Sequence, residues 1–210
     1  DLAALANPHR DSTVLTIVEV DLATLSDPVL RAPTYRAVQR LAWTGVKHAA
    51  LYGQVRALAL QWRARYLVAD ATGVGAGLVS FLARALPAGC VIPYTFNAAT
   101  KSALGWDFIS LCDSGRWRDY LPESGDAAGA DFWRELEFCQ YQALPGDGRP
   151  LRWGVPDGTR DPASGERVHD DAVLSAALAT VLDRQPWHAD TGPTHIIRAA
   201  DPLDEMNRGF

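Results

Sequence analysis

Acidic residues stand at three places in this chain where a strand is predicted to end or a helix to begin. Asp1 is the first residue, Asp70 closes the apolar run 66–70, and the pair Asp170 and Asp171 follows His169. Carboxylate oxygens are the ligands that hard divalent cations prefer. The sequence contains no GxSxG motif, and none of its cysteines has a catalytic context, so it gives no support to covalent catalysis. The acids, taken in order, therefore indicate a metal-dependent nuclease.

Asp70 has a functional and a structural interpretation. It precedes the glycine-rich stretch 71–77, whose small residues let substrate or backbone come close, and that setting suits a metal ligand. A strand-end aspartate also commonly caps the following turn or helix. The glycines match neither GxxxxGK[ST] nor GxGxxG, so a nucleotide site is not expected.

Asp170 and Asp171 open a predicted helix, where the macrodipole favours ionised carboxylates. Neighbouring helical residues point about 100° apart, so one acid is expected to ligate a metal while the other serves a second metal or an outer shell. The alternative is a simple N-cap. His169 is a candidate contact for a phosphate or a metal-bound water, or else a surface or capping residue.

Positive side chains near the predicted site are candidates for DNA contact. The net charge of −5 argues against a general nucleic-acid coat, but a basic rim around an acidic pocket is compatible with a nuclease. Only two of the 20 basic residues, Lys47 and Lys101, are lysines. We expect DNA to be contacted by Lys101, Arg116, Arg152 and Arg167.

Hydrophobic patterning predicts a sequence of strands and helices within one α/β domain. Strands are predicted at 14–20, 35–43, 66–70, 91–96, 140–144 and 151–155, and helices at 49–65, 78–86, 102–112, 131–138 and 172–182. The first two strands are expected to form an antiparallel pair. A domain over 1–186 and a tail over 187–210 are predicted. No membrane-length apolar run, signal peptide or paired cysteine pattern is evident, which predicts a cytosolic protein.

Four motifs in order resemble the nuclease domain of large terminase subunits, the packaging motors of tailed bacteriophages. They are Asp1-Leu2-Ala3 with Asp11-Ser12-Thr13-Val14, the stretch 68–77, Thr100-Lys101-Ser102, and His169-Asp170-Asp171 before an apolar helix. The resemblance implies an RNase H-like fold, with a mixed central sheet of antiparallel followed by parallel strands and helices on both faces. It assigns metal-binding and catalytic roles to Asp1, Asp70, Asp170 and Asp171, and a supporting role to Asp11.

The resemblance also implies an activity and its setting. The expected reaction is endonucleolytic cutting of concatemeric double-stranded viral DNA by two Mg²⁺ or Mn²⁺ ions roughly 3.5–4 Å apart. Portal protein and the small terminase subunit are expected partners through the full-length protein, in the cytoplasm of the bacterial host. The family's ATPase domain is not encoded in this segment, and no membrane partner is expected.

Several alternatives stay open at this stage. In the fold that the resemblance implies, the strand before the first acid lies in the middle of the sheet, whereas this sequence starts at Asp1. Asp21, which follows the strand 14–20, is a second candidate for the first acid. A junction resolvase or transposase-like nuclease, a non-catalytic module that docks on a portal or DNA, and an ASKHA-type ATPase are the competing functions.

Overall fold

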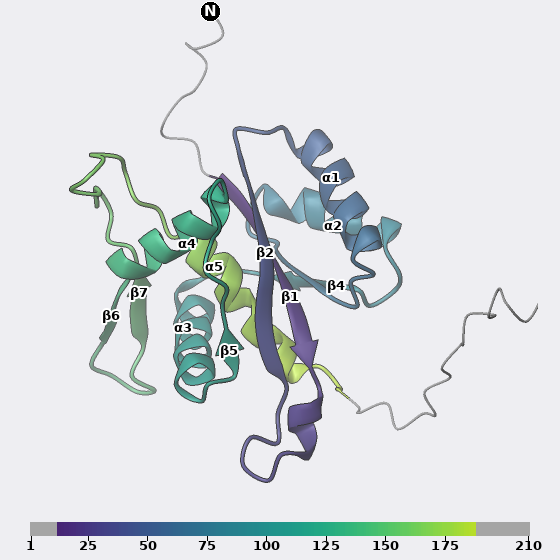
Figure 1. Cartoon of the computed structure of the whole chain (residues 1–210), viewed down its shortest axis with the longest axis horizontal. Helices are drawn as coiled ribbons and strands as arrows, with labels where there is room; N and C mark the ends of the chain where they lie inside the picture. Colours follow the sequence, from purple (N-terminus) through teal and green to yellow (C-terminus); the bar gives the residue numbers. More distant parts are fainter. Residues whose placement is uncertain (1–11, 188–210) are drawn as a thin grey trace, which may run out of the picture.

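Two long antiparallel strands form the first part of the fold. In the computed structural model, which describes residues 12–187, β1 (Ser12–Asp21) pairs with β2 (Thr34–Thr44), and the short 3₁₀ turn η2 (Ala23–Ser26) lies between them (Figure 1). Ser12 lies opposite Thr44 and Asp21 lies opposite Thr34. Both strands are rich in β-branched and aromatic residues, which favour extended backbone. The predicted antiparallel pair is confirmed.

A second, parallel pair of strands follows in the sequence. Helix α1 (His48–Gln61) leads to β3 (Leu67–Asp70), and α2 (Gly75–Ala85) then crosses over to β4 (Val91–Tyr94), which runs parallel to β3. A parallel pair requires such a crossover because its strands start at the same end. The two helices and the strand ends bury a small cluster of Leu51, Val55, Leu82, Leu86 and Cys90.

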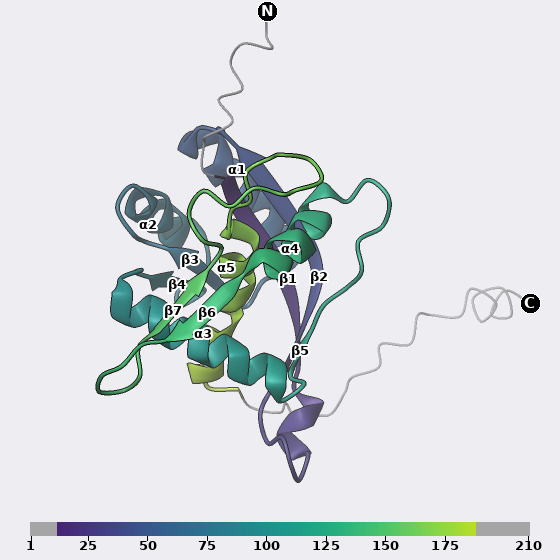
Figure 2. The same ribbon diagram turned by 90° about the vertical axis from the view of Figure 1, so that its left-hand side faces the viewer.

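The remaining elements cover the other side of the strands (Figure 2). Helix α3 (Ala98–Asp113) is followed by β5 (Trp117–Arg118), a short strand parallel to β2, and by α4 (Ala127–Phe138). The hairpin of β6 (Gln140–Ala143) and β7 (Leu151–Gly154) is antiparallel, as predicted.

The chain then reaches the central helical segment. Helix α5 (Asp171–Ala177) continues directly into the 3₁₀ segment η3 (Leu178–Arg184).

Most of the buried core gathers around α5, η3, α3 and α4. Its largest buried members include Tyr35, Leu104, Phe132 and Val173. Gly105 of α3 has no room for a side chain, because a β-carbon there would run into the indole of Trp153 on β7. This close approach fixes the hairpin against α3 and so fixes the position of Gly154, at the end of β7.

Two expectations about the fold need correction. Instead of one mixed central sheet, the described residues form three separate sheets, ordered β1-β2-β5, β3-β4 and β6-β7. No described strand lies between β1 and β3, so the antiparallel and parallel parts are not hydrogen-bonded together. The helix predicted over 172–182 tightens to 3₁₀ geometry after Ala177. Among residues 12–187, no helix is both long and apolar enough to span a bilayer.

Candidate functional site

Asp70 lies at the carboxyl end of β3, where its side chain is exposed. Its Oδ1 accepts a hydrogen bond of 2.7 Å from the N–H of Thr72, and the Thr72 hydroxyl accepts one of 2.8 Å from the N–H of Phe96, just beyond β4. A side chain at Gly75 would run into the carbonyl oxygen of Asp70. The glycine turn therefore holds Asp70 firmly at the strand end, as both the capping and the metal-ligand interpretations require.

Asp170 and Asp171 point toward different partners at the start of α5. Asp171 Oδ2 accepts a hydrogen bond of 3.3 Å from the N–H of Ser12, at the amino end of β1. Asp170 Oδ2 lies 3.2 Å from the ammonium of Lys101 on α3. Adjacent residues at a helix start diverge in this way because each turns by about 100°. The two carboxylates are thus placed for different roles.

The ion pair between Lys101 and Asp170 is built into the packing of α3 and β7. The Trp153 indole N–H donates to the carbonyl of Lys101 at 2.6 Å, and the Lys101 ammonium lies 5.9 Å from the centre of that ring. Gly154 has a φ of +127°, and a β-carbon there would collide with Asp170 Oδ2. Glycine at this position therefore leaves the space that the Asp170 carboxylate occupies.

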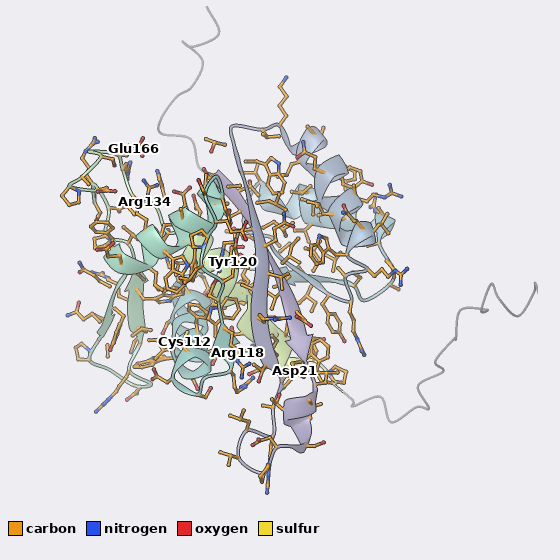
Figure 3. The ribbon with its side chains drawn as sticks, in the orientation of Figure 1. Asp21, Cys112, Arg118, Tyr120, Arg134 and Glu166 are labelled. Carbon is orange, nitrogen blue, oxygen red and sulfur yellow. The ribbon has the colours of Figure 1, made fainter. Side chains whose placement is uncertain are left out.

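Glu135, on α4, caps the start of α5 through hydrogen bonds. It is 6% exposed, and its Oε2 accepts hydrogen bonds from the N–H groups of Ala172 (2.7 Å) and Val173 (3.0 Å). These are N–H groups of the first turn, which have no partner inside the helix. Burial raises the pKa of Glu135 to about 8, more than the hydrogen bonds from Val173 and Ala172 lower it. The neighbouring residue of α4, Arg134, forms an ion pair of 3.2 Å with Glu166, in the loop between β7 and α5 (Figure 3).

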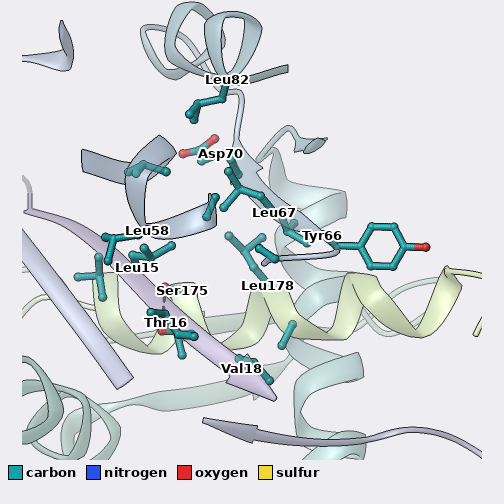
Figure 4. Close-up of a pocket in the computed structure, with 18 of the residues that line it drawn as sticks. Leu15, Thr16, Val18, Leu58, Tyr66, Leu67, Asp70, Leu82, Ser175 and Leu178 are labelled. Carbon is teal, nitrogen blue, oxygen red and sulfur yellow. Dashed lines mark hydrogen bonds between the residues drawn. The ribbon is translucent and has the colours of Figure 1, made fainter. Parts of the chain in front are cut away.

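Asp70 and Asp171 border the same groove, together with Ser12 and Gly75. Figure 4 shows Asp70 among the residues that line it. Asp70 ends strand β3 and Asp171 starts helix α5, so the fold brings two of the predicted acids from distant parts of the sequence to the lining of one groove. Within residues 12–187, no three acidic, histidine or cysteine side chains gather closely enough to hold a metal ion. Two oxygen-donor carboxylates at one groove suit a hard divalent cation, and a further ligand is needed to complete a site.

Of the candidates for the first acid, only Asp21 lies within the described residues. Asp1 and Asp11 lie outside the described residues. Asp21 ends β1 at the end opposite Ser12 and accepts a hydrogen bond of 2.9 Å from the N–H of Ala23 (Figure 3). With a rise of about 3.3 Å per residue, Asp21 is about 30 Å along the strand from the end that contacts Asp171. Asp21 is therefore too far away to share a cation with Asp171.

Comparison with known families agrees with this geometry. Residues 6–143 match the family described as the terminase RNaseH-like domain, a span that includes Asp70 and ends before Asp170. The chain belongs to the terminase RNase H-like domain family. The resemblance seen in the sequence is confirmed. No curated protein matches significantly.

A solved large terminase nuclease shows the same fold. The large terminase nuclease of thermophilic phage G20c with bound cobalt superimposes with a TM-score of 0.52 at 17% identity, over 80% of this chain and 81% of that chain. The large terminase subunit fragment of bacteriophage sf6 with calcium, a point mutant, has 12% identity and a TM-score of 0.49, over 88% of this chain and 96% of that one. At these identities the G20c match supports the RNase H-like fold.

The basic residues predicted to contact DNA are dispersed over this terminase domain. Lys101 pairs with Asp170. Arg116 donates hydrogen bonds of 2.9 Å to Asp183 and to the carbonyl of Pro33, at the far end of η3. Arg152 lies on β7 of the hairpin and is exposed. In the segment before α5, the guanidinium of Arg167 lies 3.8 Å from the carboxylate of Asp157, and His169 is half-buried next to Asp170 in the sequence.

Sequence reasoning missed Glu135 and the pairing of Lys101 with Asp170. Glu135 lies on an amphipathic helix with several other charged residues, and its hydrogen bond to Ala172 spans 37 positions. No local pattern marks it as the cap of a later helix. Lys101 was identified as a candidate for DNA contact, but its 69-residue separation from Asp170 hid the ion pair.

Proposed function

We propose that this terminase domain is a divalent-metal-dependent endonuclease that cuts concatemeric double-stranded viral DNA during genome packaging. The observation that carries the proposal is that Asp70 and Asp171 both line one groove of an RNase H-like fold. Portal protein and the small terminase subunit are proposed partners through the full-length protein. The proposed place of action is the cytoplasm of the bacterial host.

The proposed ligands are the carboxylates of Asp70 and Asp171, with Asp1 as the third. Bound Mg²⁺ or Mn²⁺ would supply an activated water and stabilise the charge that develops on the leaving 3′ oxygen. Asp171 is oriented by its position in the first turn of α5, which Glu135 caps. Asp70 is oriented by the N–H of Thr72, which engages Oδ1.

Lys101 and Asp170 form the supporting part of the proposed site. The ammonium of Lys101 offsets the charge of Asp170, so the carboxylate of Asp171 has a less repulsive neighbour. The Lys101 side chain is 36% exposed, and its ammonium is near enough to the acids to contact a phosphate of bound DNA. Asp11 is proposed to support the site as well, and His169 to contact a phosphate or a water.

Plasmid cleavage tests this proposal. The wild-type chain, Asp70→Asn and Asp21→Asn are incubated with supercoiled DNA in EDTA, Mg²⁺ or Mn²⁺. We expect metal-dependent cutting by the wild type and by Asp21→Asn, and a loss on the order of 100-fold or more in Asp70→Asn because a ligand is removed. Asp21→Asn is the matched control, since it makes the same chemical change at the far end of β1.

The same assay separates the competing functions. Branched DNA cut in preference to linear duplex would favour a junction resolvase. Retained cutting by Asp70→Asn would remove that residue from the site. A folded wild-type chain that cuts under no metal condition would favour a docking module, in which Asp70 serves only to cap its own turn through the bond to Thr72.

A further inference from the structure

Thr72 joins the turn after β3 to the segment that follows β4. Its backbone N–H donates a hydrogen bond of 2.7 Å to Asp70 Oδ1, and its hydroxyl accepts one of 2.8 Å from the N–H of Phe96. The two bonds use different groups of the same residue, so they form together. Thr72 therefore links the carboxylate of Asp70 to Phe96, which lies 24 positions after Thr72 in the sequence.

The Thr72 hydroxyl replaces a backbone acceptor at the end of the β3–β4 ladder. Asp70 and Tyr94 are the last register partners of the parallel pair, and the N–H of Ala71 still donates to the carbonyl of Tyr94 at 2.7 Å. In a regular parallel ladder, the carbonyl of Ala71 would next accept from the N–H of Phe96. That N–H donates to the side chain of Thr72 instead. The hydroxyl thus extends the pairing by one hydrogen bond beyond the end of β3.

The segment that donates this bond leads directly into helix α3. Asn97 is the N-cap of α3 and forms a capping box with Thr100. Asn97 Oδ1 accepts from the N–H of Thr100 at 2.9 Å, and Thr100 Oγ1 accepts from the N–H of Asn97 at 2.8 Å. The hydroxyl of Tyr94, on β4, also donates to the carbonyl of Thr100 at 2.7 Å. The first turn of α3 is therefore fixed relative to the end of β4.

Lys101 extends this arrangement from the first turn of α3 to the start of α5. Its N–H donates to the carbonyl of Asn97 at 2.8 Å, and its ammonium lies 3.2 Å from Asp170 Oδ2. The bond between Thr72 and Phe96 is the side-chain link from this arrangement to the turn after β3. A continuous set of hydrogen bonds and short chain segments thus leads from the Asp70 carboxylate to the ammonium of Lys101.

We propose that Thr72 is a positioning residue, whose hydroxyl fixes the turn after Asp70 against the start of α3 and so sets the placement of the Asp70 carboxylate relative to Lys101. Its consequence for catalysis rests on the proposed nuclease function. Asp70 and Phe96 both line the groove that Asp171 borders, so release of the Thr72 bond would alter this groove at its acidic end. A single exposed hydrogen bond contributes little to the free energy of unfolding. Its loss is therefore expected to affect the site more than the stability of the fold.

Three variants of the full chain test the proposal. Thr72→Val keeps the size of the side chain and the backbone N–H that engages Asp70, but it removes the hydroxyl. Thr72→Ser keeps the hydroxyl. Thr24→Val is the matched control, because the hydroxyl of Thr24 donates to the carbonyl of Ala32 at 2.7 Å between β1 and β2, at the end of β1 away from Asp171.

The exchange of the Phe96 amide is measured without metal, and single-turnover plasmid nicking is measured as a function of Mn²⁺ concentration. Thr72→Val is expected to speed this exchange by at least about 10-fold and to raise the Mn²⁺ concentration for half-maximal nicking by about 10-fold. Thr72→Ser should restore most of both, and Thr24→Val should change neither. A mere loss of folded protein would lower nicking by the same factor at every Mn²⁺ concentration and would leave the half-maximal concentration unchanged.

Other results would overturn the inference. Unchanged exchange of the Phe96 amide in Thr72→Val would mean that the hydroxyl does not hold this segment. Faster exchange with an unchanged Mn²⁺ dependence would mean that the bond stabilises the turn without positioning Asp70. Failure of Thr72→Ser to restore the wild-type values would assign the effect to the methyl group. A wild-type chain that nicks under no metal condition would contradict the proposed function, whereas a wild-type chain that nicks no differently from Thr72→Val contradicts this inference alone.

Discussion

At the scale of single residues, Asp170 and Asp171 show how neighbours acquire different functions. Asp171 faces the groove and the N–H of Ser12, whereas Asp170 is held by Lys101. We expect Asp171→Asn to abolish detectable cleavage, and Asp170→Asn to lower it by about 10- to 100-fold, as loss of an outer partner does. Single-turnover plasmid nicking in Mn²⁺ measures both, with Asp21→Asn as the control. Equal losses in the two variants would contradict this division of roles.

At the scale of elements, the helix α4 determines where α5 begins, through Glu135. The native carboxyl has a pKa of about 8 because it is buried, whereas the ordinary pKa of a glutamate is 4.5. Between these pH values the native state binds more protons than the unfolded state, so the free energy of unfolding falls as pH rises.

We expect this pH dependence to be reduced in Glu135→Gln, whose amide does not titrate. Urea denaturation between pH 5 and pH 8, about the window that the two pKa values define, measures the effect in the wild type and the variant. The amide oxygen of the new side chain remains an acceptor for the N–H groups of Ala172 and Val173, so the helix cap is largely retained. An unchanged slope in the variant would assign the pH dependence to other groups.

Helix α4 is itself anchored on the sheet by Arg40 of β2. The guanidinium is fully buried, forms two hydrogen bonds to Asp119 at 2.8 and 2.6 Å, and lies 3.6 Å from the ring centre of Phe132. Removing one partner of such a pair leaves the other charge buried, so Arg40→Ala should lower the free energy of unfolding by about 3–5 kcal/mol.

The matched control is Arg36→Ala on the same strand. Arg36 pairs with Glu19, and both side chains are more than half exposed. The free energy of unfolding is therefore expected to change by less than about 1 kcal/mol. Urea titration of the two variants gives both values. A similar loss in each would mean that the burial of Arg40 contributes nothing beyond an ordinary surface pair.

The sequence was sufficient for elements whose signal is local. The apolar runs 14–20 and 66–70 predicted strands, and the glycine turn after Asp70 predicted the following helix, because burial imposes a periodicity on nearby residues. β5 has only two residues, too few to show any period. The order of the acids supported the right family, whereas the contacts that hold them, from Glu135 and Lys101, join distant parts of the chain and have no local pattern.

At the scale of the whole molecule, the candidate site lies on the seam between two sheets. Asp70 belongs to the β3-β4 sheet, whereas Asp171 starts the helix that packs on β1. Among the described strands, none crosses this seam. A cation held by both carboxylates would therefore join parts of the fold that backbone hydrogen bonds do not connect, so metal binding should stabilise the molecule as a whole.

Mn²⁺ is accordingly expected to raise the melting temperature of the wild-type chain. A ligand that binds only the native state stabilises it by about 2.7 kcal/mol at 100 times its Kd, which corresponds to several degrees for a chain of this size. Asp70→Asn and Asp171→Asn should each remove most of the rise, because each leaves the ion attached to one side of the seam. Asp21→Asn should keep it. A rise that survives in both site variants would place the ion elsewhere, and would separate the groove from the metal chemistry of the domain.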